Sequence, residues 1–482
     1  MKRRRLVIVL SFSFCGVIIL WLLLPSCAVA IEGTEWARQI TKLGLQSAIC
    51  DLCLDSRGNI YSAGSFSGLA GFNCDYFTSY SWEPAANKAF IIRSSPTGKP
   101  YWRRMIGQHD SSVKIAGIAS DPNDCVIAAG SFRGTVDFDP GPGVSDITSK
   151  GTRDIFALKL DQTGSLEWIL TISGDDFLHV RDLTVVSDGR TFIAGDFTGS
   201  VDFPTSPQEI VTSQGDSDCF VMEVSSDGVL DNVLTWGGPG LDWATGIDAG
   251  FEGDLYVTGF FSGTVDFDPG SASVMRSAVS YRDLDIFLSK LSSDGELPYC
   301  TTWGWSNLET LTEPRVAVDD DGNAYVAGSF TISSHGDTVG SSSGDLIESH
   351  GLEDIFLSKV DTDGVHQWTR SWGGRLGDYA DDIAVADDGH VWVLGSFQDL
   401  VDFDPGTRNA VYGESRKSDR PHDFRSFLSE FDESGNFIDV YIADRRIEYS
   451  ALQVDADDAL YIAFFNYSLP VGCGFAKLRL SE

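Results

Sequence analysis

The chain has 482 residues, of which 42% are hydrophobic, 12% are aromatic and 22% are charged. This apolar fraction is enough to bury a core, which excludes wholesale disorder. Seventy Asp and Glu against 35 Lys and Arg give a formal net charge of −35. A surface this acidic repels phosphate backbones, so we expect no nucleic-acid partner.

The first 30 residues have the pattern of an export leader. A basic stretch at residues 2–5 precedes an apolar run from Leu6 to Leu24, as in secretory signals. Leu24 to Cys27 resembles a bacterial lipobox, in which Cys27 would be lipidated. Ala28-Val29-Ala30 instead fits ordinary signal peptidase, and the apolar run is also long enough to stay as an uncleaved anchor. Each alternative predicts an extracytoplasmic protein, either anchored in the membrane or secreted.

The remaining residues, 31–482, are organised by a repeated segment that is clearest at residues 255–270. Its central glycine recurs at intervals of 64 to 69 residues, a periodicity that predicts a repeat architecture. The copies are marked by Gly64, Gly130, Gly195, Gly259, Gly328 and Gly395, with Ala463 at this place in a seventh copy.

Each copy contains four short segments with strand character. In the fifth copy these are residues 315–318, 324–330, 354–360 and 365–372, and glycine-containing turns follow the first and third. Four antiparallel strands repeated seven times predict an all-β fold, a seven-bladed β-propeller that forms one domain over residues 31–482.

The two ends of this domain complement each other. Residues 34–40 match a fourth strand alone, and residues 474–480 match a third strand alone. We therefore predict that both ends complete the last blade, which closes the ring and leaves no open edge.

Several copies resemble the bacterial seven-bladed β-propeller repeat family. The resemblance lies in Trp372-Gly373-Gly374, in residues 378–397 followed by Val401-Asp402-Phe403, and in residues 354–360 with Asp363-Gly364. It extends over roughly residues 33–482. It implies an exported or surface-attached protein, and it supplies no catalytic residues.

Seven cysteines follow the leader, and they occupy unrelated positions of the repeat. We therefore expect no shared disulfide framework. Cys50 and Cys53 form a Cys-x-x-Cys pattern, but residues three apart on a strand face opposite sides, so Cys53 is interpreted as a small buried residue.

Two loops depart most from the repeat in chemistry. Between the second and third strands, the first copy has an aromatic group and the sixth copy has a basic group. Across the short loop of blade seven, the two groups are predicted to wall a notch for an acidic sugar or an anionic peptide. The alternative is two unrelated solvated loops. The predicted ligand-binding residues are Tyr76, Tyr80, Trp82, Arg416, Lys417, Arg420 and Arg425.

Repeated aspartate pairs offer a possible calcium site, because hard cations take clustered carboxylates. The same Asp-x-Asp-Pro-Gly unit forms turns without a metal, and no stretch completes a twelve-residue calcium loop. The pairs are Asp137 with Asp139, Asp266 with Asp268, and Asp402 with Asp404.

Signals for catalysis are weak. Gly340 to Gly344 has the Gly-x-Ser-x-Gly pattern without a strand-to-helix elbow, and the seven histidines show no metal spacing. Residues 163–168 are similar to the docking motif of eight-bladed quinoprotein dehydrogenases, but Asp161 is one residue out of place.

We therefore predict a monomeric, non-catalytic binding propeller for a protein or glycan ligand, without a cofactor unless calcium binds. The alternatives are a propeller enzyme, either quinoprotein-like or active on polysaccharides, and a calcium-stabilised structural protein of the cell surface.

Overall fold

The computed structural model describes residues 34–39, 46–72, 75–79, 88–107, 111–174, 176–205, 207–250, 252–279, 284–304, 312–331, 338–340, 346–406, 410–413, 424–443, 447–466 and 472–479. The elements assigned within these ranges are 39 β-strands. The described part of the chain has no helix with the length and hydropathy needed to cross a membrane.

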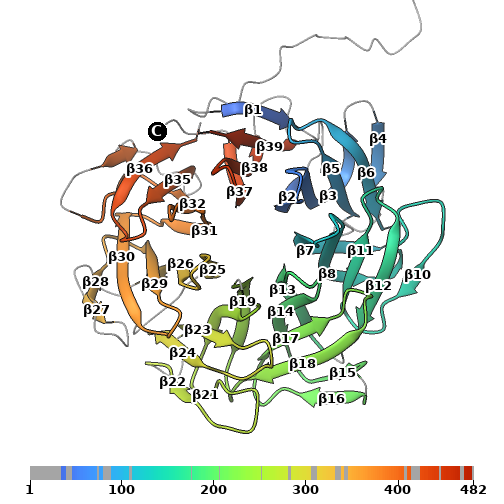
Figure 1. The fold of residues 1–482 in the computed structure, drawn as a ribbon, viewed down its shortest axis with the longest axis horizontal. Helices are drawn as coiled ribbons and strands as arrows, with labels where there is room; N and C mark the ends of the chain where they lie inside the picture. The colour runs from blue at the N-terminus through green and yellow to red at the C-terminus, as the bar shows by residue number, and fades with distance from the viewer. Residues whose placement is uncertain are drawn as a thin grey trace, which may run out of the picture.

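The strands form seven antiparallel blades around a central channel (Figure 1). Blades one to three are β2 (Gln46–Leu54), β3 (Ile60–Phe72), β5 (Lys88–Ser94) and β6 (Pro100–Ile106); β7 (Ser112–Ser120), β8 (Val126–Arg133), β11 (Asp154–Leu160) and β12 (Leu166–Ile172); and β13 (Leu178–Val185), β14 (Thr191–Phe197), β17 (Asp218–Val224) and β18 (Leu230–Trp236). Blades four and five are β19 (Asp242–Ala249), β20 (Leu255–Phe261), β23 (Asp285–Leu291) and β24 (Tyr299–Trp303); and β25 (Arg315–Val318), β26 (Ala324–Thr331), β29 (Glu353–Val360) and β30 (His366–Gly374). Blades six and seven are β31 (Tyr379–Val385), β32 (Val391–Phe397), β35 (Arg425–Phe431) and β36 (Phe437–Ile442); and β37 (Ile447–Val454), β38 (Leu460–Asn466), β39 (Gly472–Leu478) and β1 (Thr34–Gln39).

The predicted all-β, seven-bladed β-propeller is confirmed. The first strand of each blade lies nearest the channel and the fourth lies at the rim (Figure 1). In blade seven, β1 pairs with β39, with Trp36 opposite Lys477 and Arg38 opposite Phe475. The prediction that the two ends of the domain share the last blade is therefore also confirmed.

Five blades carry a small hairpin between their second and third strands, and blade one has the extra strand β4 (Asp75–Ser79) beside β3. In the second blade, Phe138 anchors this hairpin, because its ring lies 5.1 Å from those of both Phe132 and Phe156. The hairpins are β9 (Thr135–Asp137) with β10 (Asp146–Thr148), β15 (Ser200–Phe203) with β16 (Glu209–Thr212), β21 (Thr264–Asp266) with β22 (Met275–Ser277), β27 (Thr338–Gly340) with β28 (Leu346–Glu348), and β33 (Leu400–Asp402) with β34 (Val411–Gly413).

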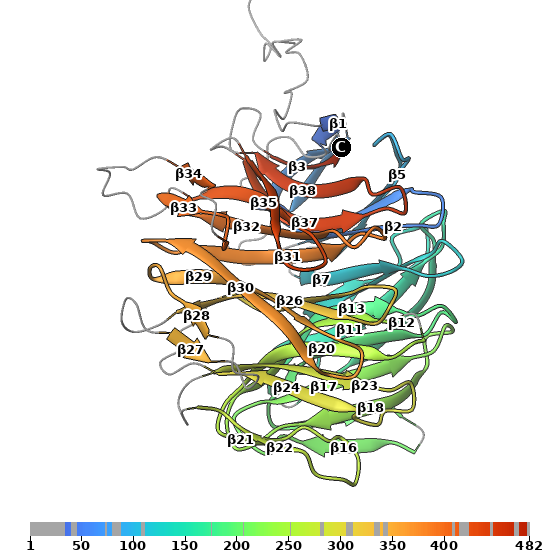
Figure 2. The ribbon, with the colours of Figure 1, turned by 60° about the vertical axis from the view of Figure 1, so that its left-hand side comes forward.

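Thirteen five-residue turns connect first to second strands and third to fourth strands. Each has positive φ at its fourth residue, which is glycine except at Asp124 and Asp458. These turns occupy one face of the ring, and the small hairpins such as β27–β28 and β33–β34 lie toward the other (Figure 2). We call the first the tight-turn face and the second the long-loop face.

The marker glycines are required by close packing inside each blade. A Cβ on Gly259 would lie 1.8 Å from the Trp243 carbonyl oxygen and 2.9 Å from the Phe287 ring. In blade seven the residue that pairs as the marker glycines do, just before the bulge of the inner strand, is Phe464, which lies opposite Tyr449 and Gly474. Ala463 lies one position nearer the turn, opposite Ala451, so its predicted place as the seventh marker is wrong by one residue. Glycine and phenylalanine have exchanged strands in this blade.

The hydrophobic core consists of seven clusters, one at each junction between neighbouring blades. The cluster of blades one and two, for example, joins Ile91 and Ile106 to Ile115 and Leu158. The junction of blades seven and one has its own cluster, which joins Phe475 to Phe90. Each sheet therefore buries both of its faces only when the ring is complete.

Removal of residues 34–40 should expose the edge of β39, because this segment contains the only strand that pairs with that side of β39 in the described structure. Lost burial and ladder bonds should cost several kcal/mol of a total stability of roughly 5–15 kcal/mol, and the open edge should promote aggregation. Urea unfolding and light scattering would measure both effects. A chain that begins at Thr34 is the control. An unchanged unfolding midpoint in the deletion variant would contradict the closure.

Gly259→Ala should lower the free energy of unfolding by about 1–3 kcal/mol or more, because the added methyl overlaps the Trp243 carbonyl. Ala463→Gly, in the second strand of blade seven one position nearer the turn than the marker, is the comparison change, and it should cost only about 0.5–1 kcal/mol. Urea titration of both variants would test this order. Equal costs would show that the marker glycine is not required by packing.

Candidate functional site

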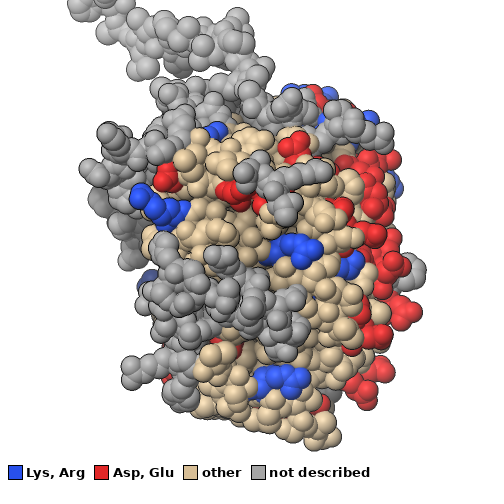
Figure 3. Space-filling view, turned by 90° about the vertical axis from the view of Figure 1, so that its left-hand side faces the viewer, with Lys and Arg blue, Asp and Glu red and all other residues tan. Residues whose placement is uncertain are grey.

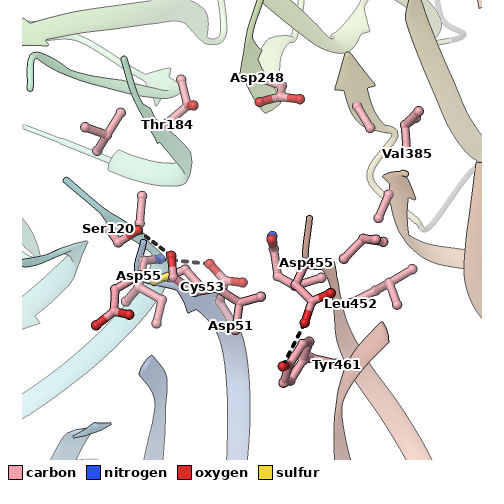
Figure 4. Close-up of a pocket in the computed structure, with 18 of the residues that line it drawn as sticks. Asp51, Cys53, Asp55, Ser120, Thr184, Asp248, Val385, Leu452, Asp455 and Tyr461 are labelled. Carbon is pink, nitrogen blue, oxygen red and sulfur yellow. Dashed lines mark hydrogen bonds between the residues drawn. The ribbon is translucent and has the colours of Figure 1, made fainter. Parts of the chain in front are cut away.

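The central channel opens on the tight-turn face as a cavity of about 770 Å³. Its wall is made by the ends of the seven inner strands, and Asp51, Asp248 and Asp455 reach it from different sides of the ring (Figure 4). A site at this position is shared by all blades, so its chemistry depends on which side chain each inner strand contributes.

Three blades contribute an aspartate at the same place, four residues before the first residue of the inner turn. Asp51 accepts a hydrogen bond from Leu52 N at 2.7 Å and one from Ile118 N of the next blade at 2.8 Å. Asp182 bridges blades three and four in the same way, and Asp382 bridges blades six and seven. These carboxylates therefore clamp successive inner strands together.

A fourth carboxylate, that of Asp248, lies two residues nearer the turn and accepts a hydrogen bond from Val318 N at 2.9 Å. Blade five has Arg315 at the place of the three aspartates. Its Nη1 donates to Thr245 O at 2.7 Å and lies 3.8 Å from Asp182 Oδ2. The guanidinium thus offsets part of the negative charge across the channel.

Burial shifts the proton affinity of these groups. It raises the pKa of Asp248 to about 7 and that of Asp382 to about 6, even though backbone donors oppose the shift in both. Burial also raises the pKa of Asp51 and of Asp182, and the second is opposed by Arg315. Burial thus moves the protonation of Asp248 and Asp382 toward neutral pH.

The hydrogen bonds limit what this site can do chemically. In each of the four aspartates, one oxygen accepts from the following residue and the other accepts from the next blade. A carboxylate held on both oxygens by backbone donors serves as a structural clamp with a negative field. Sequence analysis missed this ring, although the constant spacing of Asp51, Asp182 and Asp382 from the turns was a usable signal.

The acidity extends from the channel mouth over the whole tight-turn face. The thirteen turns contain 22 Asp and Glu against three Lys and Arg. Figure 3 shows Asp and Glu gathered along the edge of the molecule that corresponds to the face turned to the viewer in Figure 1. Charges of one sign around a concave mouth focus their field on it.

The predicted notch falls mainly outside the described residues. Tyr80, Trp82, Arg416, Lys417 and Arg420 all lie there, and so does Cys27. Tyr76 belongs to β4, for which only the backbone is described. Arg425 begins β35, where its guanidinium lies 5.8 Å from the Phe397 ring centroid and donates to Ala443 O at 3.3 Å. The binding role of these residues stays a prediction.

The candidate calcium ligands are engaged in turns. Asp137 Oδ1 accepts hydrogen bonds from Asp139 N at 3.0 Å and Ser145 N at 2.8 Å, and Asp139 Oδ1 accepts one from Gly141 N at 2.7 Å. The same bonds recur at the other two pairs, Asp266 with Asp268 and Asp402 with Asp404. Over the described ranges, no group of three His, Cys, Asp or Glu side chains is arranged to hold a metal ion.

The described cysteines agree with only part of the interpretation from spacing, because the bulge of β2 brings Cys50 against the same core cluster as Cys53 and the two do not face opposite sides. Cys53 is buried, and Cys50 occupies the bulge of β2, where its Sγ lies 3.3 Å from Ala63 O. Among the described residues, the thiols of Cys50, Cys53, Cys125, Cys219 and Cys300 are free.

These features define the chain as a seven-bladed β-propeller. No family model matches it. A 228-residue stretch is 21% identical to an uncharacterised WD repeat-containing protein of Acanthamoeba polyphaga mimivirus, and the match covers 42% of this chain and 16% of that relative's length. The Dos1 propeller is 8% identical with a TM-score of 0.42, over 94% of this chain and 98% of that one. Sqt1 from Chaetomium thermophilum is 9% identical with a TM-score of 0.41, over 92% of this chain and all of that one (100%).

Stability should fall as the pH rises from about 4 to 7. The pKa of Asp248 is raised from 3.8 to about 7 by burial, so the folded state holds this proton more tightly than the unfolded state. The stabilisation from this proton is complete below the pKa of Asp248 in the unfolded state. It is lost as the pH rises through the pKa of Asp248 in the folded state. Asp248→Asn should flatten the profile by up to about 1.4 kcal/mol per pH unit, the value for one proton.

Urea unfolding at a series of pH values would measure this slope. Asp227→Asn, which neutralises an exposed turn carboxylate, is the control and should leave the slope between pH 4 and 7 nearly unchanged. A wild-type profile that rises with pH over this window would contradict the proposed role of the channel carboxylates.

Proposed function

We propose that this protein is an exported β-propeller of the bacterial seven-bladed repeat type, which binds a basic protein partner on its tight-turn face. One observation carries the proposal, namely the 22 acidic against three basic residues in the turns around the channel mouth. A field of one sign attracts a partner of the other sign and orients it before contact.

The arrangement of the site favours binding over catalysis. The channel carboxylates are held by backbone donors on both oxygens, as Asp51 is by Leu52 and Ile118. A general base needs a free oxygen within reach of the proton that it abstracts. The rigid ring, by contrast, holds its turns in fixed positions, as a binding surface requires.

Export and attachment are part of the same proposal. Basic residues 2–5 and the apolar run to Leu24 support export, and Cys27 supports a lipid anchor at the membrane surface. An anchored propeller would hold its binding face in the extracytoplasmic space. The glycan alternative, with the predicted notch on the long-loop face, stays a prediction.

Carbodiimide cross-linking in producing cells, followed by mass spectrometry, would test the proposed face. We expect zero-length bonds between turn carboxylates, such as Asp321, Asp388 and Asp457, and lysines of one partner. Neutralising these three residues to Asn should reduce recovery of that partner about tenfold, since each exposed charge contributes roughly 0.2–1 kcal/mol.

The matched control neutralises three exposed aspartates on the long-loop side of the ring, Asp176, Asp202 and Asp216. It should leave recovery nearly unchanged. Cross-links confined to the long-loop side, or an equal loss in both triple variants, would refute the assignment of the partner to the tight-turn face.

A further inference from the structure

Six of the seven blade junctions are filled in the same way on the tight-turn face. The fourth strand of one blade packs a large side chain against the glycine of the next blade's turn between its third and fourth strands. A Cβ on Gly228, for example, would lie 2.5 Å from the Trp168 ring. The pairs are Trp36 with Gly98, Trp102 with Gly164, Trp168 with Gly228, Leu234 with Gly295, Tyr299 with Gly364, and Trp368 with Gly435.

At several of these junctions the fourth strand also donates hydrogen bonds to the turn. Trp102 Nε1 donates to Gln162 O at 2.8 Å, and Arg104 Nε donates to Gly164 O at 2.8 Å. Trp368 and Arg370 repeat this arrangement at the junction of blades five and six. The filled junction is thus an aromatic contact plus donors that meet the carbonyls of a turn.

The junction between blades six and seven has no such turn, because the third and fourth strands of blade seven are the two ends of the domain. A groove of about 910 Å³ lies there. Its apolar lining includes Trp392, Tyr441 and Ile438. Its charged lining has five carboxylates against one guanidinium, that of Arg479, with His390 beside them. The carboxylates are those of Asp388, Glu430, Asp439, Asp457 and Asp458. Ile438 is 43% exposed, and the rings of Trp392 and Tyr441 lie 6.2 Å apart.

The polar groups of this groove have the opposite character to those of the filled junctions. In register, Asp439 of β36 faces Glu430, just as Trp368 faces Lys359 in blade five. The groove therefore presents a carboxylate acceptor where blades one, two and five present an indole donor. A turn carbonyl cannot bind to an acceptor, so the occupant of this groove must supply donors.

In blade six the third strand places a carboxylate, and not a cation, opposite the aromatic ring of the second strand. In blades five and seven, Lys359 and Lys477 each place Nζ 4.9 Å from the ring centroid of the tyrosine opposite. In blade six the residue opposite Trp392 is Glu430, which pairs with His390 at 2.7 Å. An external cation near Trp392 would restore the cation and aromatic pairing of the other blades.

We propose that the groove between blades six and seven binds an arginine or lysine side chain of a partner protein. The aliphatic part of that side chain packs on Ile438 and Tyr441, and its charged end pairs with Asp439 and Asp458. The proposal rests on the proposed function, since it names the point on the tight-turn face where a basic partner is anchored.

Crowding of like charge supports this assignment. Slight burial, and then the carboxylates of Asp388 and Asp387, raise the pKa of Asp458. A bound guanidinium or ammonium group would relieve this repulsion, and binding should therefore weaken as salt is added.

The probe is the peptide acetyl-Gly-Arg-Gly-Arg-Gly-amide, with the same peptide carrying citrulline for arginine as its neutral counterpart. The protein is labelled with 5-fluorotryptophan, and Trp392→Phe assigns the resonance of Trp392 in fluorine NMR. We expect a saturable shift of that resonance with the arginine peptide and none with the citrulline peptide. An unmoved Trp392 resonance would overturn the proposal.

Calorimetry gives a second test that does not depend on Trp392→Phe folding. Asp439→Asn with Asp458→Asn should weaken binding of the arginine peptide about tenfold, the loss expected when both charges paired with it are removed. The control, Asp227→Asn with Asp294→Asn, removes two exposed charges at filled junctions of the same face and should change the affinity less than about twofold.

Equal weakening by both double variants would overturn the groove as the anchor while leaving the wider acidic face intact as a binding surface. A Trp392 resonance that shifts on deletion of residues 480–482, without peptide, would place this chain's own end in the groove and also overturn the proposal. Binding of the arginine peptide in the groove, with no partner cross-linked to the tight-turn face in cells, would instead count against the proposed function alone.

Discussion

Each blade of this protein is a sheet with two apolar faces, and neither face can be buried by the blade itself. The seven core clusters all lie at blade junctions, and the last of them joins Phe475 near one end of the domain to Phe90 near the other. Because the hydrophobic effect scales with the apolar area removed from water, the ring is stable only when closed. The channel, the acidic face and the groove are consequences of that closure.

The same ion pair within a blade is kept with different residues around the ring. Lys290 pairs with Asp254 at 3.0 Å in blade four, and the charges are exchanged in blade three, where Arg190 pairs with Glu223 at 2.6 Å. Each pair joins the end of the inner turn to the third strand. Removing one partner of a largely buried pair costs more than the pair contributes, so a change in one strand requires a matching change in the other.

The fold was predictable because its signals are local and repeated. The marker glycines, the turn sequences and the two incomplete ends each follow from short-range chemistry, and Gly395 does pair with a third-strand phenylalanine, Phe427. The small hairpins were harder to predict, because Asp-Phe-Asp-Pro-Gly indicates a turn without showing where Phe138 packs. Its partners, Phe132 and Phe156, are brought to it only by the blade.

The candidate site was not predictable to the same degree. The function of Asp51 depends on Ile118, which is 67 residues away and adjacent only across a blade junction. A strand pattern shows which residues face the channel, but it does not show that a carboxylate reaches the next strand. The predicted notch was inferred from the aromatic and basic residues of two loops on the long-loop face. The observed groove follows instead from the missing turn of blade seven, a consequence of the shared blade that sequence analysis did not draw.

β1 and β39 are neighbouring strands of one sheet. The chain could therefore begin in a different blade without any change in the order of the blades around the ring. A circular permutant could join the present ends through a short turn and begin instead within the turn at residues 161–165. Every strand pairing would be kept, while the break in the covalent chain would move from blade seven to blade two. The junction without a turn between third and fourth strands would move with it, to the space beside Trp102. The position of the groove therefore follows from which blade is shared by the two ends of the domain, and permutants could place it beside other blades.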